Sequence, residues 1–316
     1  MSARPTVLVL GGGPDAERQV SIESSRAVAE ALREDGRFAV ELRIIDAITL
    51  AELRALEGDV VFPALHGPFG EGGAMQSLLE LDGRPYVGSA PGAARLAMDK
   101  LAGKIIAGSI GVPTPVGACL NVRDDVCPIP LACVVKPVHE GSSVGLSLCR
   151  SEDEWDAALA GVRTDRATHP DRVWMVESLI EGRELTVGAL DLGGGLESVG
   201  VVEIQAASGS YDYEAKYERD DTRYTIDPEL PGGVSERIQR QAIELCRAMG
   251  VRHLARVDFM LGRDGTAWAL EVNTMPGFTA HSLLPKLARE RGIGLGRMCA
   301  GLVELAMGAR ARSRSL

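Results

Sequence analysis

Four polar residues near the C-terminus have types and spacing suited to binding a cation. Arg256, Asp258, Glu271 and Asn273 lie in two apolar stretches that flank a turn centred on Asp264-Gly265. Asp-Gly is favoured in the two-residue type I′ turn, which predicts a hairpin in which Asp258 faces Glu271. The same register sets Arg256 opposite Asn273, and all four polar side chains share one face because side chains alternate along a strand.

The other face of this hairpin is expected to be apolar, with the side chains of Val257, Phe259, Leu270 and Val272. Two facing carboxylates about 5 Å apart repel each other by roughly 3 to 4 kcal/mol at an effective dielectric of about 20. A cation would offset this repulsion, and two carboxylates with an amide oxygen form the hard oxygen set that Mg²⁺ prefers. The alternative is a solvated hairpin face whose charge is balanced by Arg256. The pattern favours a Mg²⁺ site that shares its ion with a substrate phosphate.

A second group of residues is suited to binding phosphate. Val134-Val135-Lys136-Pro137 predicts a buried strand with a lysine near its end, and it leads into the loop Glu140-Gly141-Ser142-Ser143-Val144-Gly145. Small residues leave the backbone N–H groups of this loop free to surround an oxyanion. The alternative is an ordinary glycine turn beside a surface lysine. The loop is not a Walker A sequence, so we expect a nucleotide held between elements, and the polar stretch from Tyr211 to Tyr217 is typical of a lid.

The turn from Gly11 to Ala16 admits a different interpretation. It follows an apolar strand and resembles the dinucleotide-binding fingerprint, with Asp46 as a candidate ribose partner. However, Pro14 and Asp15 place a rigid ring and a negative charge where a pyrophosphate would approach. A helix N-terminus beside Glu17 could hold a small zwitterion instead. The residues alone leave both possibilities open.

Length and composition limit the classes of protein to which the chain could belong. With 316 residues it has room for two or three domains, since one core rarely grows beyond about 250 to 300 residues. A net charge of −10 and a pI near 5.1 disfavour nucleic-acid and anionic-membrane partners. No apolar run approaches the roughly 20 residues of a membrane span or forms a signal peptide, so we expect a cytoplasmic protein. The cysteines form no CxxC pair and are expected to be buried, reduced thiols: Cys119, Cys127, Cys133, Cys149, Cys246 and Cys299.

Strands and helices are expected to alternate in the first part of the chain. Apolar periodicity predicts, in order, a strand at 6–10, a helix at 17–32, strands at 38–45 and 59–65, and a helix at 74–81. This is the pattern of a parallel βαβ domain. After it, the pattern predicts a helix over 94–110, a strand at 131–136, a helix from residue 152 and a strand at 173–177. We therefore expect an α/β domain over residues 1–93, and α+β domains over residues 94–182 and 183–316.

Motifs along nearly the whole chain resemble those of the D-alanyl-D-alanine ligase family, whose members have the ATP-grasp fold. The similarity is colinear from Val7 to Leu287. It is carried by Glu17-Arg18-Gln19-Val20-Ser21, Leu65-His66-Gly67, Met98-Asp99-Lys100, Lys136-Pro137, Glu140 to Gly145, Tyr211 to Tyr217, Arg256-Val257-Asp258, Glu271 to Thr279 and His281-Ser282-Leu283. The resemblance implies a Rossmann-like substrate-binding domain, a small central ATP-grasp subdomain and a larger C-terminal one with the lid and the metal site.

The resemblance also implies where ATP and metal ions bind. The residues implied for ATP are Lys100, Lys136, Glu177, Ser178, Leu179, Ile180, Glu184 and Lys216. The lysines would lie on the phosphates, the two glutamates near adenine and ribose, and residues 178–180 would form the hinge strand. Two Mg²⁺ ions, or Mn²⁺ in their place, would bridge the phosphates through Asp258, Glu271 and Asn273, the set that the hairpin spacing already indicates.

Two D-alanine sites follow from the same resemblance. Glu17 would bind the amino group of the first D-alanine, and Ser282 with the backbone of Leu283 would bind the carboxylate of the second. His66 would contact the second substrate, although a buried histidine held by the backbone is the alternative.

Other residues would act on the reaction itself. Ser142 and Tyr217 would join Glu17 in a hydrogen-bonded set that closes the lid. Arg256 and the backbone N–H of Gly277 would stabilise the oxyanion of the second step.

The activity implied is ATP-dependent ligation of two D-alanines through an acyl phosphate, with release of ADP and phosphate, for peptidoglycan precursor synthesis. The expected partners are ATP and D-alanine, with no nucleic acid and no membrane, and a homodimer is usual for the family. Two alternatives remain: a ligase of the same fold with another acceptor, and a nucleotide-binding protein without turnover. The chain departs from the family pattern at Gly72 and Ser77, which affects details of substrate approach and not the reaction class.

Overall fold

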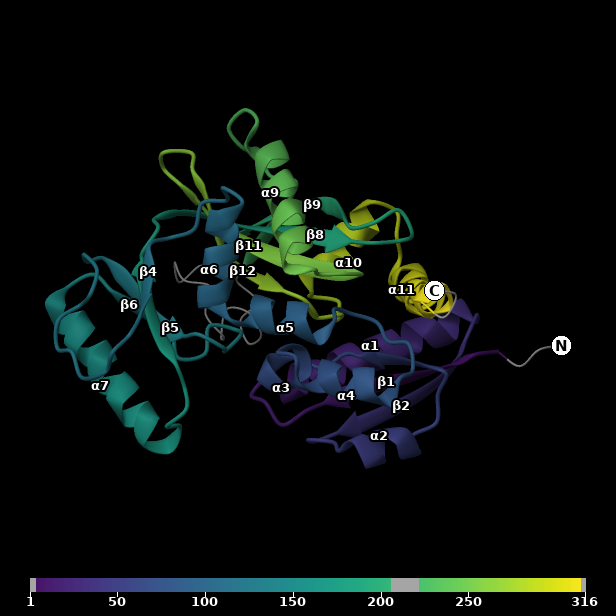
Figure 1. Ribbon diagram of the computed structural model, residues 1–316. Helices are drawn as coiled ribbons and strands as arrows, with labels where there is room; N and C mark the ends of the chain where they lie inside the picture. Colours follow the sequence, from purple (N-terminus) through teal and green to yellow (C-terminus); the bar gives the residue numbers. More distant parts are fainter. Residues whose placement is uncertain (1–3, 206–221, 314–316) are drawn as a thin grey trace.

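The computed structural model describes residues 4–205 and 222–313, and the strands within them form three sheets. In Figure 1 the N-terminal sheet lies at the lower right, the central sheet at the left and the C-terminal sheet above them. The expected combination of a parallel α/β part with antiparallel α+β parts is confirmed. The domain boundaries after residues 93 and 182 stay predictions.

The N-terminal part is built on a parallel sheet in the order β2-β1-β3. Its elements are β1 (Thr6–Gly12), α1 (Arg18–Asp35), β2 (Ala39–Ile45), α2 (Leu50–Ala55), β3 (Val60–Pro63), α3 (Gly67–Glu71), α4 (Ala74–Asp82) and α5 (Pro91–Met98). The central strand β1 buries Val7 to Leu10 completely, as expected of a parallel strand covered on both faces. The predicted βαβ pattern is confirmed, with each predicted strand present to within two residues at either end.

The single helix predicted over residues 94–110 is wrong, because the chain forms two helices there. The helix α5 ends at Met98, and α6 (Lys100–Ser109) starts in a new direction after Asp99. The Asp99 side chain accepts hydrogen bonds from the backbone N–H groups of Leu101 (2.9 Å) and Ala102 (3.0 Å) and so caps the second helix. As a result, Lys100 occupies the first turn of α6.

The central part is a four-stranded antiparallel sheet in the order β4-β7-β5-β6. Its elements are β4 (Gly117–Cys119), β5 (Cys133–Pro137), β6 (Ser147–Cys149), α7 (Glu152–Thr168) and β7 (Trp174–Ser178). One face packs against α7, whose buried residues Trp155, Leu159 and Val162 belong to the same cluster as Val135 and Val176 of the sheet. The opposite face of this sheet is left for the cleft described below.

The C-terminal part contains a five-stranded antiparallel sheet in the order β10-β9-β8-β11-β12. Its elements are β8 (Gly182–Leu190), β9 (Glu197–Gln205), β10 (Arg223–Ile226), α9 (Val234–Met249), β11 (Leu254–Gly262), β12 (Ala267–Asn273), α10 (Leu283–Glu290) and α11 (Leu295–Ser313). The helix α9 covers one face and shares a hydrophobic cluster with β8, β11 and β12.

The hairpin of β11 and β12 pairs as predicted at its functional end, although its turn differs. Asp258 faces Glu271 and Arg256 faces Asn273. The predicted two-residue turn is wrong, because the Gly262 N–H donates to the Thr266 carbonyl (2.8 Å) across a three-residue loop. A bulge beyond Asp258 compensates for this extra residue and restores the pairing. Leu270 occupies the bulge and lines the cleft, and so does not lie on the apolar face where the alternation predicts it.

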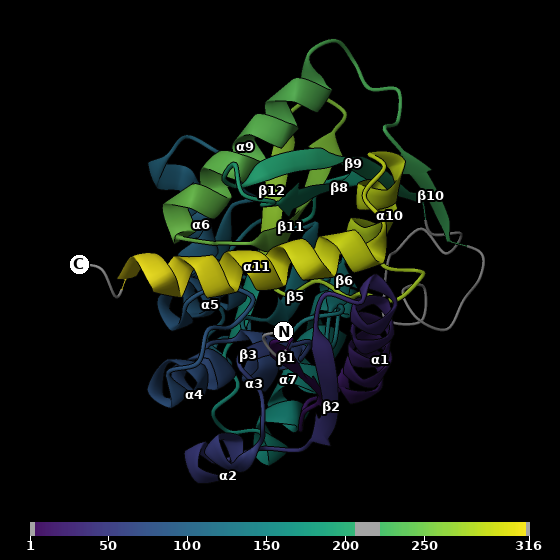
Figure 2. The same ribbon diagram turned by 90° about the vertical axis from the view of Figure 1, so that its right-hand side faces the viewer.

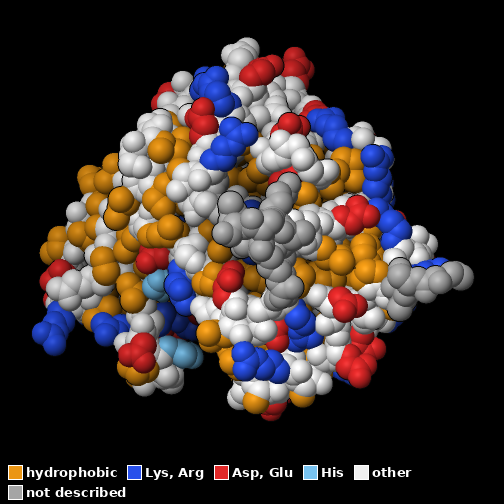
Figure 3. Space-filling view, turned by 45° about the vertical axis from the view of Figure 1, so that its right-hand side comes forward, with side chains coloured by type: hydrophobic (Ala, Val, Ile, Leu, Met, Phe, Trp, Pro, Cys, Tyr) orange, Lys and Arg blue, Asp and Glu red, His pale blue; other side chains and the backbone are white. Residues whose placement is uncertain are grey.

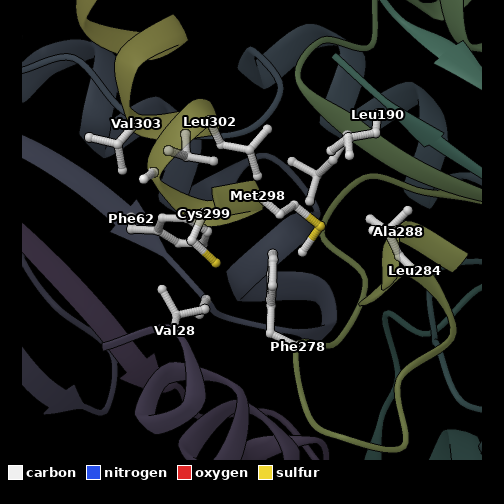
Figure 4. Packing of buried hydrophobic residues seen from close by; sticks show 14 of the residues in the cluster. Val28, Phe62, Leu190, Phe278, Leu284, Ala288, Met298, Cys299, Leu302 and Val303 are labelled. Carbon is white, nitrogen blue, oxygen red and sulfur yellow. The ribbon is translucent and has the colours of Figure 1, made fainter. Parts of the chain in front are cut away.

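The helix α11 returns to the N-terminal part and joins it to the C-terminal sheet. Figure 2 shows α11 running between the C-terminal strands and β1 to β3. Figure 4 shows Met298, Leu302 and Val303 of this helix beside Phe62 of β3 and Phe278 of a C-terminal loop. The rings of Phe62 and Phe278 meet edge to face with centroids 5.3 Å apart. One core therefore spans both ends of the chain.

Charges of both signs are distributed over the surface. On the face in Figure 3, Lys and Arg side chains are interspersed with Asp and Glu side chains, and hydrophobic side chains gather toward the left of the view. Across residues 4–205 and 222–313, none of the helices has the length and apolar character needed to cross a bilayer.

Candidate active site

A cleft of about 460 Å³ lies between the central sheet and the C-terminal sheet. This size is in the range of small-molecule sites. Residues predicted for nucleotide and metal binding line it together: Lys100, Lys136, Glu177, Ser178, Leu179, Ile180, Glu184, Asp258 and Glu271. The glycine-rich loop contributes Ser143 and Val144 to the same lining. The fold thus gathers into one cleft residues that are far apart in the sequence.

Two lysines hold the carboxylate of Glu177 beneath this cleft. Lys136 donates to Oε1 of Glu177, and Lys104 Nζ lies 2.6 Å from Oε2. Burial alone would raise the pKa of Glu177, but the Lys136 and Lys104 ammonium groups outweigh it and hold that pKa below its ordinary value. Burial lowers the pKa of Lys104, and Glu177 opposes that effect. Both carboxylate oxygens are therefore used to hold lysines, which favours a positioning role for Glu177.

Sequence analysis missed Lys104, although a signal for it exists. It follows Lys100 by four residues in α6, which places both lysines on one face of the helix. The Lys104 ammonium also donates to Thr114 Oγ1 (3.0 Å) and to the Pro115 carbonyl (2.8 Å). A lysine repeated at helical spacing beside Lys100, which is predicted to bind phosphate, would have indicated it.

The carboxylates of the hairpin are balanced by basic side chains. Arg256 donates to Asp258, with Nε 2.9 Å from Oδ1 and Nη2 3.0 Å from Oδ2. Lys100 Nζ lies 3.2 Å from Oε2 of Glu271. Thr186 also donates to Asp258 Oδ1. The charge compensation that the facing carboxylates require is thus supplied by Arg256 and Lys100 together.

The donor set of the hairpin suits a hard cation when a phosphate completes it. Asp258 and Glu271 offer carboxylate oxygens, and Asn273 Oδ1 accepts a hydrogen bond from Met275 N–H (3.0 Å) that fixes the amide. Among the described residues, no group of three or more His, Cys, Asp or Glu side chains has a metal-binding arrangement. Two carboxylates and one amide fit Mg²⁺ only together with waters and substrate oxygens, as is usual for that ion.

A smaller cavity of about 90 Å³ adjoins the cleft. It collects the residues predicted for the amino acids and for the oxyanion: Glu17, His66, Ser142, Arg256, Gly277, Ser282 and Leu283. Glu271 lines both the cleft and this cavity. Because Glu271 is shared, a phosphate in the large cleft and an amino acid in the small cavity can meet beside it.

Glu17 and Ser142 connect the N-terminal part to the glycine-rich loop. Ser142 donates to Oε1 of Glu17, and both side chains are buried. A Cβ on Gly141 would lie only 2.8 Å from Oε2 of Glu17, so the loop needs glycine there to approach this closely. Ser142 itself has a positive φ of 50°, which aims its side chain at Glu17 at some conformational cost.

His66 lines the small cavity with both ring nitrogens engaged by the protein. Nδ1 lies 3.0 Å from the Met275 carbonyl oxygen, and Nε2 lies 3.1 Å from Ser24 Oγ. Burial lowers the pKa of His66, which keeps the ring neutral. These contacts favour the alternative of a buried histidine held by its surroundings. Because His66 also lines the small cavity, a contact with the second substrate stays a prediction.

Two polar residues that sequence analysis did not assign support this cavity. Ser24 accepts a hydrogen bond from the Phe278 N–H (3.1 Å) as well as contacting His66. Glu71 is buried, and its oxygens accept from the N–H groups of Gly67 and Met275, both at 3.3 Å. Burial, reinforced by the charge of Glu17, raises the pKa of Glu71 well above its ordinary value. A clue to Ser24 was available, because serines recur at helical spacing on the buried face of α1.

The loop before α10 brings Gly277, Ser282 and Leu283 to the small cavity. A Cβ on Gly277 would lie 2.6 Å from Ser282 Oγ, so a glycine allows the loop to close on that hydroxyl. Ser282 Oγ also accepts from the Thr279 N–H (3.0 Å). Leu283 is the first residue of α10, and the N–H groups at a helix N-terminus suit a carboxylate.

The turn after β1 is held by contacts within the protein, which disfavours the dinucleotide interpretation. Arg18 donates to the carbonyls of Gly13 and Ile45, both at 2.8 Å, and pairs with Asp46 at 2.7 Å. Asp15 accepts from the Phe69 N–H (2.7 Å) and so ties this turn to α3. The candidate ribose partner is therefore already paired with Arg18.

The departures from the family pattern are accommodated locally. A Cβ on Gly72 would lie 2.3 Å from the Pro68 carbonyl oxygen, so this arrangement of α3 requires glycine there. Ser77 donates to the Gly73 carbonyl (2.8 Å) and accepts from Arg95 (2.7 Å). Lys216 and Tyr217 lie outside the described residues.

Comparisons with known proteins place the chain in one family. A family model described as "D-ala D-ala ligase C-terminus" matches residues 122–304, and one described as "D-ala D-ala ligase N-terminus" matches residues 47–89. A D-alanine--D-alanine ligase of Bordetella avium is 40% identical over 302 residues, covering 93% of this chain and 92% of that protein.

Solved structures give the same result. The D-alanine--D-alanine ligase from Bacillus anthracis complexed with ATP is similar with a TM-score of 0.81 and 30% identity, covering 99% of this chain and 100% of that one. The VanG D-Ala:D-Ser ligase from Enterococcus faecalis is similar with a TM-score of 0.80 and 26% identity, covering 96% and 100% of the two chains.

Proposed function

Since the chain belongs to the D-alanine–D-alanine ligase family, we propose that its two adjoining cavities hold ATP and two D-alanine molecules for a two-step ligation. The chain is an ATP-dependent ligase that joins two D-alanines for peptidoglycan synthesis. The observation that carries the assignment of residues is the position of Glu271, which lines both the large cleft and the small cavity. The phosphate to be transferred and the carboxylate that receives it would meet there.

In the first step, a carboxylate oxygen of the first D-alanine attacks the γ-phosphorus of ATP. The new O–P bond forms as the bond to the β-phosphate oxygen breaks, which gives an acyl phosphate and ADP. Lys100 and Lys136 would balance the charge on the phosphates from the floor of the cleft, and Lys216 would act from the lid. Glu17 would hold the ammonium group of the first D-alanine at the N-terminus of α1.

Asp258, Glu271 and Asn273 would hold two Mg²⁺ ions, or Mn²⁺ in their place. When bound, such ions neutralise the phosphate oxygens and orient the transferred group. Arg256 pairs with Asp258 and Lys100 with Glu271, so both basic groups would lie beside the substrate oxygens that the ions hold.

In the second step, the neutral amine of the second D-alanine attacks the acyl carbon. Its carboxylate would bind Ser282 Oγ and the backbone N–H of Leu283. Arg256 and the Gly277 N–H would stabilise the tetrahedral oxyanion, and removal of one such donor typically costs about 3 to 4 kcal/mol. The C–O bond to phosphate then breaks, the departing phosphate takes up the proton that the nitrogen loses, and the dipeptide remains.

Water must be excluded while the acyl phosphate exists, since it hydrolyses readily. Ser142 and Glu17 are joined across the small cavity, and Tyr217 would complete this set when the lid closes. Glu177 would keep Lys136 in place, while Ser178, Leu179, Ile180 and Glu184 would contact the nucleoside from the lining of the cleft.

The identity of the second substrate is tested by competition. A tyrosine at 217 is neutral at physiological pH and would not repel the ammonium form of D-alanine, as a protonated histidine would. Purified protein should be given ATP, Mg²⁺, D-alanine and an equal concentration of D-lactate or D-serine between about pH 6 and pH 9. We expect D-alanyl-D-alanine as the dominant product, with one phosphate released per dipeptide. Dominant depsipeptide near pH 6 would reject the role of Tyr217, and phosphate release without any ligated product would reject the proposed function.

We further propose that the enzyme works in the cytoplasm as a homodimer, because ATP is a substrate and because homodimers are usual for the family. Sedimentation analysis of the purified protein tests the oligomeric state, and a monomer at assay concentrations would reject it.

A further inference from the structure

Three cysteines cluster in the central sheet and have no part in the ligation. Cys133 opens β5, and Cys149 lies opposite it in β6. Cys127 belongs to the loop that precedes β5, and its Sγ lies 3.7 Å from the Sγ of Cys133. All three are free thiols, and all belong to or pack against the core under α7.

We propose that Cys127 and Cys133 form a reversible disulfide when the protein meets hydrogen peroxide, and that this bond alters the nucleotide cleft. The two sulfurs are already in contact, and a disulfide needs an S–S distance of about 2.05 Å. Cys127 is partly exposed, whereas Cys133 and Cys149 are buried, so an oxidant reaches Cys127 first. Burial raises the pKa of the Cys133 and Cys149 thiols, which makes them poor initial targets of peroxide.

The reaction balances in two steps. The Cys127 thiolate attacks one oxygen of hydrogen peroxide, the O–O bond breaks, and the hydroxide that leaves takes up a proton to become water. The sulfur of Cys133 then attacks the Cys127 sulfenic sulfur, the S–O bond breaks, and the hydroxide leaves as water with the proton of Cys133. Two thiols are oxidised to one disulfide and one peroxide is reduced to two waters. A dithiol such as dithiothreitol reverses the change by thiol exchange.

Cys133 is a better partner for Cys127 than Cys149 is. Cys149 donates its thiol hydrogen to the carbonyl oxygen of Glu154 at 3.6 Å, which engages it with the start of α7. Cys127 and Cys133 have sulfur atoms 3.7 Å apart, and Cys127 is the more exposed of the two thiols that contact Cys133, since Cys149 also interacts with the Cys133 side chain. The cross-link is therefore expected between these two residues.

The proposed bond adjoins residues that line the nucleotide cleft. Cys133 pairs with Ser178 across β5 and β7, and the Leu179 N–H donates to the carbonyl of the neighbouring Ala132 at 3.0 Å. Lys136 follows on the same strand as Cys133. Drawing Cys133 toward Cys127 by more than about 1 Å would therefore shift the predicted hinge, and displacements of this size can lower turnover about 100-fold.

Differential thiol labelling tests the pair in the full-length protein. After peroxide treatment the protein is unfolded in urea and its free thiols are blocked with one reagent. It is then reduced with dithiothreitol, and the newly freed thiols are labelled with a second reagent. Trypsin should give residues 124–150 as one peptide that contains all three cysteines, because Lys136 precedes a proline. We expect the second label on Cys127 and Cys133 and the first label on Cys149. This readout does not depend on ligase activity, so it stands apart from the proposed function.

Activity at limiting ATP is measured on the same samples. We expect a loss of about tenfold or more after peroxide and recovery with dithiothreitol. Cys119→Ser, which removes an exposed thiol of the same sheet, should respond as the unmodified protein does. The Cys127→Ser variant should keep its activity after peroxide treatment. If Cys127→Ser fails to fold, the Cys133→Ala variant serves for the same test.

Four outcomes would overturn the proposal. In one, the blocking reagent is found on Cys127 and Cys133 under conditions that oxidise Cys119, which means that no disulfide has formed. In another, the reagent added after reduction is found on Cys133 and Cys149, which means that these two residues form the disulfide. The remaining two are full ligase activity of the cross-linked protein, and a loss of activity after peroxide in the Cys127→Ser variant that equals the loss in the unmodified protein.

Discussion

At the scale of single residues, each of the two facing carboxylates of the hairpin is paired with a basic side chain. Asp258 is paired with Arg256, and Glu271 with Lys100. Leaving one charge of a buried pair without a partner is costly. A metal ion bound to these carboxylates would therefore have to replace the positive charge that Arg256 and Lys100 supply.

Glu271→Gln should lower Mg²⁺-dependent turnover at least about 100-fold while the fold stays intact. The amide is a weaker ligand for a hard cation, and Lys100 keeps its hydrogen bond to the Glu140 carbonyl. Steady-state ligation and thermal unfolding would be measured together. Glu30→Gln, on the exposed face of α1, serves as the control for a change of net charge. Turnover close to that of the unmodified enzyme would rule out the metal-binding role.

Lys104→Met should destabilise the protein by about 3 to 5 kcal/mol, because it removes one partner from a buried ion set. Glu177 would then keep only Lys136, and its lowered pKa would rise toward the ordinary range. The double variant Lys104→Met/Glu177→Gln should recover part of that loss, since it removes the stranded carboxylate. Urea unfolding of the double variant and of both single variants gives the free energies of unfolding from which the interaction energy between Lys104 and Glu177 is calculated. Losses that simply add would show that Lys104 and Glu177 do not act together.

At the scale of elements, the hairpin shows what the sequence could predict and what it could not. A two-residue turn at Asp264-Gly265 predicted that Asp258 faces Glu271, and the pairing is confirmed. The predicted turn is wrong, yet the register holds, because the bulge at Leu270 cancels the longer loop. The bulge lies on the edge strand β12, while the pairing of β11 with β8 is unbroken, and Leu270 carries no sequence signal for a bulge. The break between α5 and α6 was readable in principle, because Asp99 is a good N-cap residue.

The glycine-rich loop carries a prediction of its own. Ser142→Ala should lower kcat about tenfold or more and change the KM for ATP less than about twofold, because the hydroxyl binds Glu17 and not the nucleotide. Ser143→Ala is the matched control, since its side chain lines the large cleft and should affect ATP instead. Both constants come from initial rates at varied ATP. A tenfold rise in the KM for ATP with unchanged kcat in the Ser142→Ala variant would reassign Ser142 to the nucleotide.

At the scale of the whole molecule, the two ends of the chain share one core. The helix α11 packs with Val28 and Phe62 of the N-terminal part, and Phe278 of a C-terminal loop completes the cluster (Figure 4). Apolar periodicity predicted most of these elements but not their contacts, because periodicity shows which face is buried and not against which partner. The gathering of the site residues into one cleft came from the family resemblance, since nothing local in the sequence brings Glu17 to Ser142.

His253 supplies a second connection between the N-terminal and C-terminal parts. Its Nδ1 accepts a hydrogen bond from the Gly88 N–H (3.0 Å), and its φ of 70° is unusual for a residue other than glycine. Burial, reinforced by Arg252, lowers the pKa of His253 to about 4. The folded protein thus holds this ring neutral at pH values where the unfolded chain binds a proton.

The free energy of unfolding should therefore fall as the pH drops from about 6.5 to about 4, and this histidine should contribute at most about 3 kcal/mol to the fall. Below the folded pKa of about 4 the contribution is constant, and above about 6.5 it vanishes. His253→Asn keeps an acceptor for the Gly88 N–H and tolerates the positive φ, but it does not titrate. Unfolding of both proteins by urea across this range should give curves that converge as the pH falls, with the unmodified protein losing more stability than the variant. Curves that stay parallel would show that His253 is not held neutral by its burial between the two parts.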